Sequence, residues 1–354
     1  MTTRLEARYR LLLRLLPRWY RAEREEELVE VFMAAEAVRE EPDDETGQFR
    51  GEYGWPDRAE VAAMVALAVR TRFGGVNAPA PARRWGDTVR LVALLGLLVQ
   101  AAYSLMSVAS IAVAGWVGPP QIADYLARVT APLTWGDWRE AVGLLLQLLW
   151  IPAYLLLATG RRRAARLVTA VALLPSVVAV LSAVLQDGMM LRAALVGGCV
   201  VWFSAACVFL GFHGDAPRPE SRPWLIALPA AALAIGGVVV AAILAGPAVT
   251  AAMGPWADGS WALVLGGVGL LAARLCAPRS VPGPWLAAVA LLCVPFALMQ
   301  VGYLAVFGLP SGIPVAAVLA PPSALAVVTT VLAVSARRRQ PEWSSTGLPS
   351  ADRF

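Results

Sequence analysis

The sequence is short of charged residues and has no lysine at all. Only 16% of its 354 residues are charged and 58% are hydrophobic, whereas about one quarter of an average soluble domain is charged. An ordinary water-soluble protein is therefore excluded. All 30 basic residues are arginines, against 25 acidic residues, and the arginines after residue 90 sit in short clusters between long apolar runs. This pattern predicts a polar N-terminal part followed by a helical membrane domain.

Residues that usually carry chemistry are also scarce. The four cysteines, Cys199, Cys207, Cys276 and Cys293, lie inside or at the edge of apolar segments without CxxC spacing or a histidine partner. This excludes a disulfide framework and a zinc site, and we expect them to be buried as small hydrophobic side chains. The chain has no GxxxxGK[ST], GxSxG or HExxH motif. We therefore predict no catalytic residue, no metal, no cofactor and no enzymatic activity.

A single histidine, His213, is the strongest remaining candidate for acid–base chemistry. It lies near Asp215 and Glu220 in a connection between two apolar runs. These three residues are all that a membrane enzyme could begin to use at one face of the bilayer. Because general acid–base catalysis needs a positioned partner and a substrate pocket, we expect an ordinary loop histidine.

Eight apolar segments are long enough to be considered membrane spans, at about 20 residues for one crossing. They are Val89–Val113, Ala141–Ala158, Leu167–Leu185, Ala193–Gly211, Trp224–Ala245, Trp261–Ala273, Trp285–Phe307 and Ile313–Val334. Lipid offers no hydrogen-bond partners, and these uniform runs lack the alternating polarity of barrel strands, so each should be helical. The expected fold is an all-α polytopic membrane protein.

Arginines in the connections predict the orientation. With the N-terminal part inside the cell, the inner loops and tail hold Arg161, Arg162, Arg163, Arg166, Arg218, Arg222, Arg274, Arg279 and Arg337–Arg339, and the outer loops hold only Arg128, Arg139 and Arg192. This satisfies the positive-inside rule with an even number of spans. The first residues are too charged for a secretory signal peptide. We therefore expect a multi-pass protein of the inner (plasma) membrane with both termini in the cytoplasm.

The N-terminal part should form three short helices. The first carries Leu5, Tyr9, Leu12, Leu13 and Leu16 at helical spacing and should end at Pro17. The second runs from about Arg21 to Arg39, with Leu28, Val29, Phe32 and Ala35 on one face. The third begins at Pro56, has an apolar face of Val61, Met64, Val65 and Ala68, and stops at Gly74–Gly75. Residues 40–53 should form a loop, and the near-neutral charge of this part does not favour nucleic-acid binding.

The segment LLRLLPRWYRAEREEELVEVF (Leu12–Phe32) resembles the HAAS-type signalling domain and related permease-prefix modules of bacterial, especially actinobacterial, membrane proteins. Those modules have a Leu-rich helix, a proline break, and an Arg/Glu helix ending in an aromatic residue. The resemblance covers roughly the first 75 residues. It implies a cytosolic helical module fused to a membrane domain, with a transcription regulator or sigma factor as partner. The candidate partner-binding residues in this segment are Trp19, Tyr20, Arg21, Glu25 and Phe32.

The predicted spans contain no ionisable residue in their interiors. Their most polar positions are Gln100, Gln147 and Gln300. Hydrogen bonding between helices is the expected role of these glutamines, and lining a polar cavity is the alternative. A pump coupled to protons or sodium is disfavoured, because such coupling needs a site that changes charge.

The sequence therefore predicts a non-enzymatic signalling or regulatory membrane protein, with a transporter or permease for an uncharged or lipid-like solute as the alternative. The expected organisation is a cytosolic module (residues 1–78), a linker (79–88), an eight-helix membrane domain (89–335) and a disordered cytosolic tail (336–354). The oligomeric state stays open.

Overall fold

The computed structural model describes residues 4–39, 55–75, 78–117, 138–185, 188–213, 216, 219–244, 260–277, 281–309 and 314–337. The described residues form helices, turns and short connections, with no strand among them. The chain divides into two compact units. The first, called here the module, consists of residues 1–87 together with Leu210–Ala216, and the second contains Thr88–Phe209 and Pro217–Phe354. Residues 336 and 337 of the predicted tail belong to a helix, and the rest of the tail and the loop at residues 40–53 lie outside the described residues.

Three helices lie wholly within the described part of the module, as the sequence predicted: α1 (Arg4–Leu13), α2 (Arg18–Arg39) and α4 (Arg58–Arg72). Pro17 ends the first helical segment and lies directly before α2. Pro56 lies two residues before α4 rather than at its first position, because Asp57 is the N-cap residue and accepts a hydrogen bond from the backbone N–H of Arg58. At the other end, Gly74 has a φ of 85°, a left-handed conformation that ends helices and favours glycine.

Residues 79–88 do not form a separate linker. Helix α5 (Ala80–Val117) begins at Ala80 and continues without interruption into the first predicted span. At 38 residues it is about 57 Å long. This length exceeds the roughly 30 Å of a bilayer's hydrocarbon core, so part of the helix must extend beyond it.

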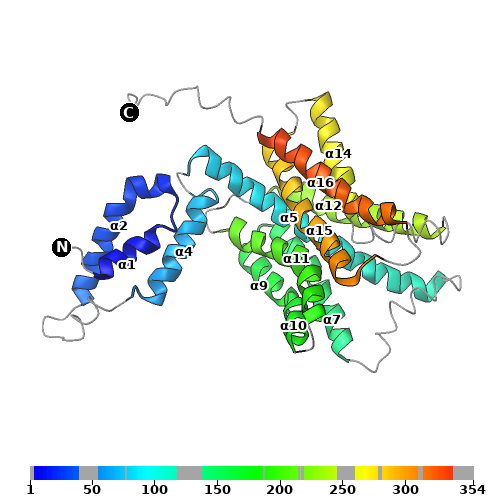
Figure 1. Cartoon of the computed structure of the whole chain (residues 1–354), viewed down its shortest axis with the longest axis horizontal. Helices are drawn as coiled ribbons and strands as arrows, with labels where there is room; N and C mark the ends of the chain where they lie inside the picture. Colours follow the sequence, from blue (N-terminus) through cyan, green and yellow to red (C-terminus); the bar gives the residue numbers. More distant parts are fainter. Residues whose placement is uncertain are drawn as a thin grey trace. The chain divides into compact units, whose positions relative to one another are not determined.

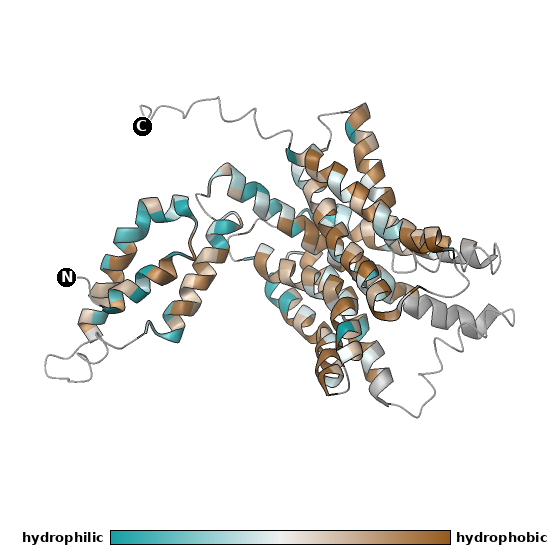
Figure 2. Ribbon diagram, in the orientation of Figure 1, coloured by the Kyte–Doolittle hydropathy of each residue, from teal (hydrophilic) through white to brown (hydrophobic). Residues whose placement is uncertain are grey.

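Each of the eight predicted spans is occupied by helix, and the protein is a polytopic helical membrane protein (Figures 1 and 2). The helices after α5 are α7 (Trp138–Leu148), α8 (Trp150–Ala158), α9 (Arg162–Ala172), α10 (Leu174–Val184), α11 (Gly188–Gly211), α12 (Ser221–Leu244), α14 (Ser260–Cys276), α15 (Gly283–Phe307) and α16 (Val315–Arg337). Among the described residues, six stretches are long and apolar enough to cross a membrane. The two shorter apolar stretches are Leu145–Ala158 and Ser260–Cys276, which correspond to the second and sixth predicted spans.

The second and third predicted spans are interrupted helices, each with a proline just after the break. Helix α7 gives way to α8 at Leu149, three residues before Pro152, and α9 gives way to α10 at Leu173, two residues before Pro175. A proline lacks the N–H for an i→i−4 hydrogen bond, and its ring clashes with the preceding turn. The two prolines therefore explain both breaks.

Helix α11 packs closely on two neighbours in the membrane unit. A Cβ built on Gly96 of α5 would collide with the Ser204 side chain of α11. On α15, a Cβ built on Gly302 would lie 2.6 Å and 2.7 Å from the two γ-carbons of Val196 of α11. Small residues allow helix backbones to approach closely in a bilayer, and these two glycines lie at close crossings of α11.

The two Pro-Trp segments that begin α12 and α15 lie against each other. The rings of Trp224 and Trp285 stack with centroids 5.8 Å apart and an interplanar angle of 5°. The hydroxyl of Tyr154, which is fully buried, donates a hydrogen bond to the backbone oxygen of Trp224 at 2.6 Å. These contacts fix the first turns of α12 and α15 relative to α8.

All four cysteines are free thiols. Cys207 and Cys293 are buried, and Cys199 is half-buried. Cys276 is exposed at the last residue of α14, so the expectation of burial is wrong for this residue.

Candidate functional site

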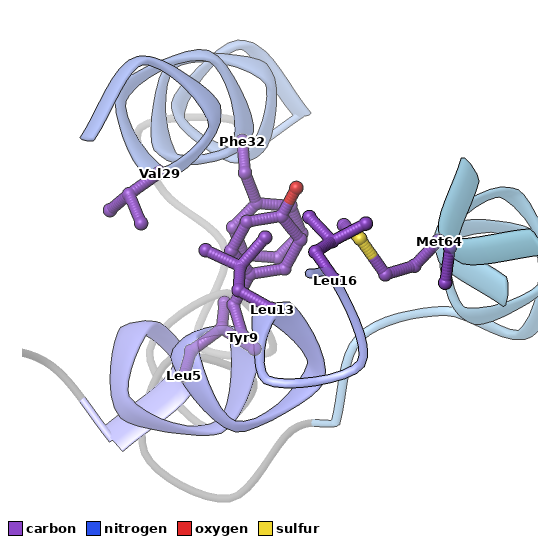
Figure 3. Packing of buried hydrophobic residues seen from close by; sticks show 8 residues of the cluster. Leu5, Tyr9, Leu13, Leu16, Val29, Phe32 and Met64 are labelled. Carbon is purple, nitrogen blue, oxygen red and sulfur yellow. The ribbon is translucent and has the colours of Figure 1, made fainter. Parts of the chain in front are cut away.

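The module has its own hydrophobic core, made by all three helices (Figure 3). Tyr9 of α1 and Phe32 of α2 stack with ring centroids 4.0 Å apart and an interplanar angle of 3°. The remaining buried members are Leu5, Leu13, Leu16, Val29, Met64 and Ala68. Every one of these apolar side chains is removed from water, which stabilises the module by about 1.5–3 kcal/mol for each large residue relative to exposure.

Ion pairs join α1 to α2 at the edge of this core. Arg10 donates hydrogen bonds to Glu26 on α2 at 2.8 Å and 3.0 Å and to Glu6 on its own helix at 3.0 Å and 3.1 Å. Its hydrogen bonds to the Glu26 and Glu6 carboxylates raise the pKa of Arg10, and the Arg10 guanidinium lowers the pKa of Glu26. The Arg10–Glu26 pair is solvent-accessible, so it contributes more to the register of the two helices than to stability.

The candidate partner-binding residues from the sequence mostly point inward. Phe32 is buried in the core, so it is not available to a partner. Arg21 and Glu25 form an ion pair at 4.0 Å, with side chains only 26% and 30% exposed. Tyr20 packs against the core. The Trp19 ring lies edge-on to the Tyr20 ring, with the two ring centroids 5.5 Å apart. Only part of the Trp19–Tyr20 pair therefore reaches the surface.

The opposite face of α2 is exposed along its whole length, and it has two different halves. We call it the outer face; its members are Glu23, Glu27, Glu30, Val31, Ala34 and Val38. The first three are carboxylates at helical spacing, and the last three are apolar. Val31 is 63% exposed and Val38 is 87% exposed. The sequence analysis assigned these valines no role, because all its candidate contact residues were aromatic or charged.

The loop after α11 belongs to the module. Phe212 and His213 are 1% and 5% exposed. The His213 ring nitrogen Nε2 lies 3.1 Å from the backbone oxygen of Phe73, the C-cap residue of α4, and a carbonyl can only accept, so the ring donates. The last carbonyls of a helix lack partners within it. His213 therefore caps α4 from a position 140 residues later in the chain.

Comparisons of the chain with protein-family models, with curated proteins and with solved structures found no match. The described residues also contain no group of three His, Cys, Asp or Glu side chains that could hold a metal ion.

The three glutamines of the membrane unit are placed at helix contacts. The Gln300 side chain donates to the Ser260 hydroxyl at 2.8 Å and so joins α15 to α14. Gln100 and Gln147 come together through their backbones, because the Ser104 hydroxyl lies 2.9 Å and 3.0 Å from their two carbonyl oxygens. The Gln147 side chain itself is exposed. The Gln300 side chain thus joins two helices, whereas the Ser104 hydroxyl of α5 reaches α7 at the backbone oxygen of Gln147.

Proposed function

We propose that this integral membrane protein is a non-catalytic regulatory protein of the plasma membrane whose N-terminal module binds a cytosolic partner. The resemblance to HAAS-type modules suggests a transcription regulator or a sigma factor as that partner. The arrangement of arginines supports a cytoplasmic location for the module and for both termini.

The observation that carries this proposal is a polar module with a closed core, built partly from a loop of the membrane domain. Its three helices bury their own apolar residues, so the module does not need lipid to fold its core. Its composition differs from that of the membrane unit, and its exposed side chains include both charges and apolar residues. Such a module is suited to contact another protein while the spans keep it at the bilayer.

The test compares two substitutions on α1 in the full-length, affinity-tagged protein in its own cells. Leu13→Asp places a carboxylate in the core, where Leu13 is fully buried, and an unpaired buried charge costs several kcal/mol. Leu11→Asp makes the same chemical change at a side chain that is 50% exposed. We expect a cytosolic protein to co-purify with the wild type and with Leu11→Asp but not with Leu13→Asp.

Cell-surface abundance and detergent extraction should be equal for the three proteins, which shows that the membrane domain is intact. If the same cytosolic proteins co-purify with the wild type and with both variants, the module does not recruit a partner. The same conclusion follows if no cytosolic protein co-purifies with the wild type.

A further inference from the structure

We propose that the outer face of α2 is the docking surface for the cytosolic partner, and that the partner presents a helix with arginine or lysine residues in one half and small apolar residues in the other. This inference rests on the proposed function and adds to it the place of binding and the chemistry of the partner.

The carboxylate half of the outer face carries three like charges that a cationic partner would pair. Glu23, Glu27 and Glu30 follow one another at four- and three-residue spacing, and like charges at such spacing destabilise a helix by about 0.2–0.5 kcal/mol for each pair. The one basic side chain among the ion pairs of this half is Arg24, which contacts Glu27 at 3.2 Å. Arg24 and Glu27 are both more than half exposed, so a second cation can reach the group.

The apolar half offers a shallow surface for close packing. Val31, Ala34 and Val38 lie one below the other on the helix and are all exposed. Alanine between two valines allows a second helix to approach within about 8–10 Å, with small side chains between the two axes. Two exposed helical turns without a polar side chain on this line favour a protein contact, because surfaces of this kind gain free energy when covered.

Charge decides between the possible occupants. A bilayer surface is negatively charged on its cytoplasmic side, and helices that lie on it carry basic residues beside their apolar face. A second copy of α2 would place carboxylates against carboxylates in a parallel pair and against valines in an antiparallel pair, and both arrangements are unfavourable. A helix with a basic half and an apolar half matches both parts of the outer face.

The experiment uses the full-length protein in its own cells with a benzophenone amino acid at Ala34. Illumination should attach the chain to a cytosolic protein, and mass spectrometry should place the attachment on a helix with arginine or lysine residues next to an apolar stretch. Glu30→Lys should reduce the yield about tenfold, since like charges at an interface disfavour association. Exchanging the facing basic residue of the partner for glutamate should restore the yield with Glu30→Lys.

Two matched controls separate the surface from general effects of charge and polarity. Glu220→Lys makes the same charge change at an exposed residue outside the module, and it should leave the yield unchanged. Val31→Ser should lower the yield several-fold, whereas Val65→Ser, at an exposed valine of α4, should not.

Attachment to lipid, to a second copy or to residues 40–54 of the same chain would overturn the inference. So would a yield unaffected by Glu30→Lys and Val31→Ser. If a cytosolic protein still co-purifies in a Leu13-dependent way, the proposed function stands and only the docking surface is wrong. If no cytosolic protein is recovered in either experiment, both fail.

Discussion

Among single residues, Tyr9 makes the stability of the folded module depend on pH. Burial and the nearby Glu60 carboxylate, which its hydroxyl contacts by a hydrogen bond, raise the pKa of Tyr9 to about 12 from a usual value of 10.0. The folded module thus holds this proton more tightly than the unfolded chain does. The stabilisation is fully present below pH 10.0 and is lost as the pH rises through about 12. We expect the difference in absorbance between the wild type and Tyr9→Phe to show one phenol with a titration midpoint near pH 12. A midpoint near pH 10 would contradict this prediction.

The inward-facing residues of the module could be predicted from the sequence only in part. Apolar spacing correctly placed Tyr9, Leu13 and Phe32 on inward faces. It also predicted Val65 inward, although that side chain is 46% exposed, because a helix of alanines and valines has no strong polar face. Phe32 was predicted both as a core residue and as a partner contact, and its stacking on Tyr9 excludes the second role.

At the scale of the element, glycines control how closely α11 and α15 pack. Gly302→Ala would push a methyl group against Val196, whose branched side chain has little rotamer freedom in a helix. Overpacking of this kind costs about 1–3 kcal/mol. We expect a lower thermal midpoint for the full-length protein in detergent, followed by circular dichroism at 222 nm. Gly266→Ala, at a glycine of α14 with open space around it, should be neutral or stabilising. Equal midpoints for the two variants would show that the α11–α15 contact tolerates a larger separation.

The positions of the spans could be predicted from the sequence because hydrophobic length alone determines them. Their interruptions at Leu149 and Leu173 could not, since prolines are common in membrane helices and the sequence does not reveal which of them break the helix. Pro229, Pro295, Pro321 and Pro322 lie inside continuous helices of the same protein. In membrane helices, neighbouring helices, Ser and Thr side chains and local backbone adjustments can satisfy the carbonyls that a proline frees.

At the scale of the whole molecule, the native Cys276 tests the orientation of the chain. It is the exposed cysteine at the end of α14, next to the arginines of a predicted cytoplasmic loop. A membrane-impermeant maleimide should therefore not label it in intact cells and should label it after permeabilisation. Cys276→Ser should remove that signal. Labelling in intact cells would place this loop outside and invert the proposed topology.

The module is discontinuous in sequence, because Leu210–Ala216 group with residues 1–87. Phe212 and His213 come from the connection between α11 and α12, which groups with the module, and both are buried. His213 caps α4 at Phe73. Removing a buried phenylalanine costs about 3–5 kcal/mol, which is a large part of the stability of so small a unit.

We expect Phe212→Ala in the full-length protein to speed amide hydrogen exchange throughout α1, α2 and α4. His213→Gln should speed exchange only in the last turn of α4, because it removes a cap and keeps the Phe212 side chain. Exchange in α15 should not change in either variant. Exchange rates in α4 that change with neither substitution would show that this loop does not stabilise the module.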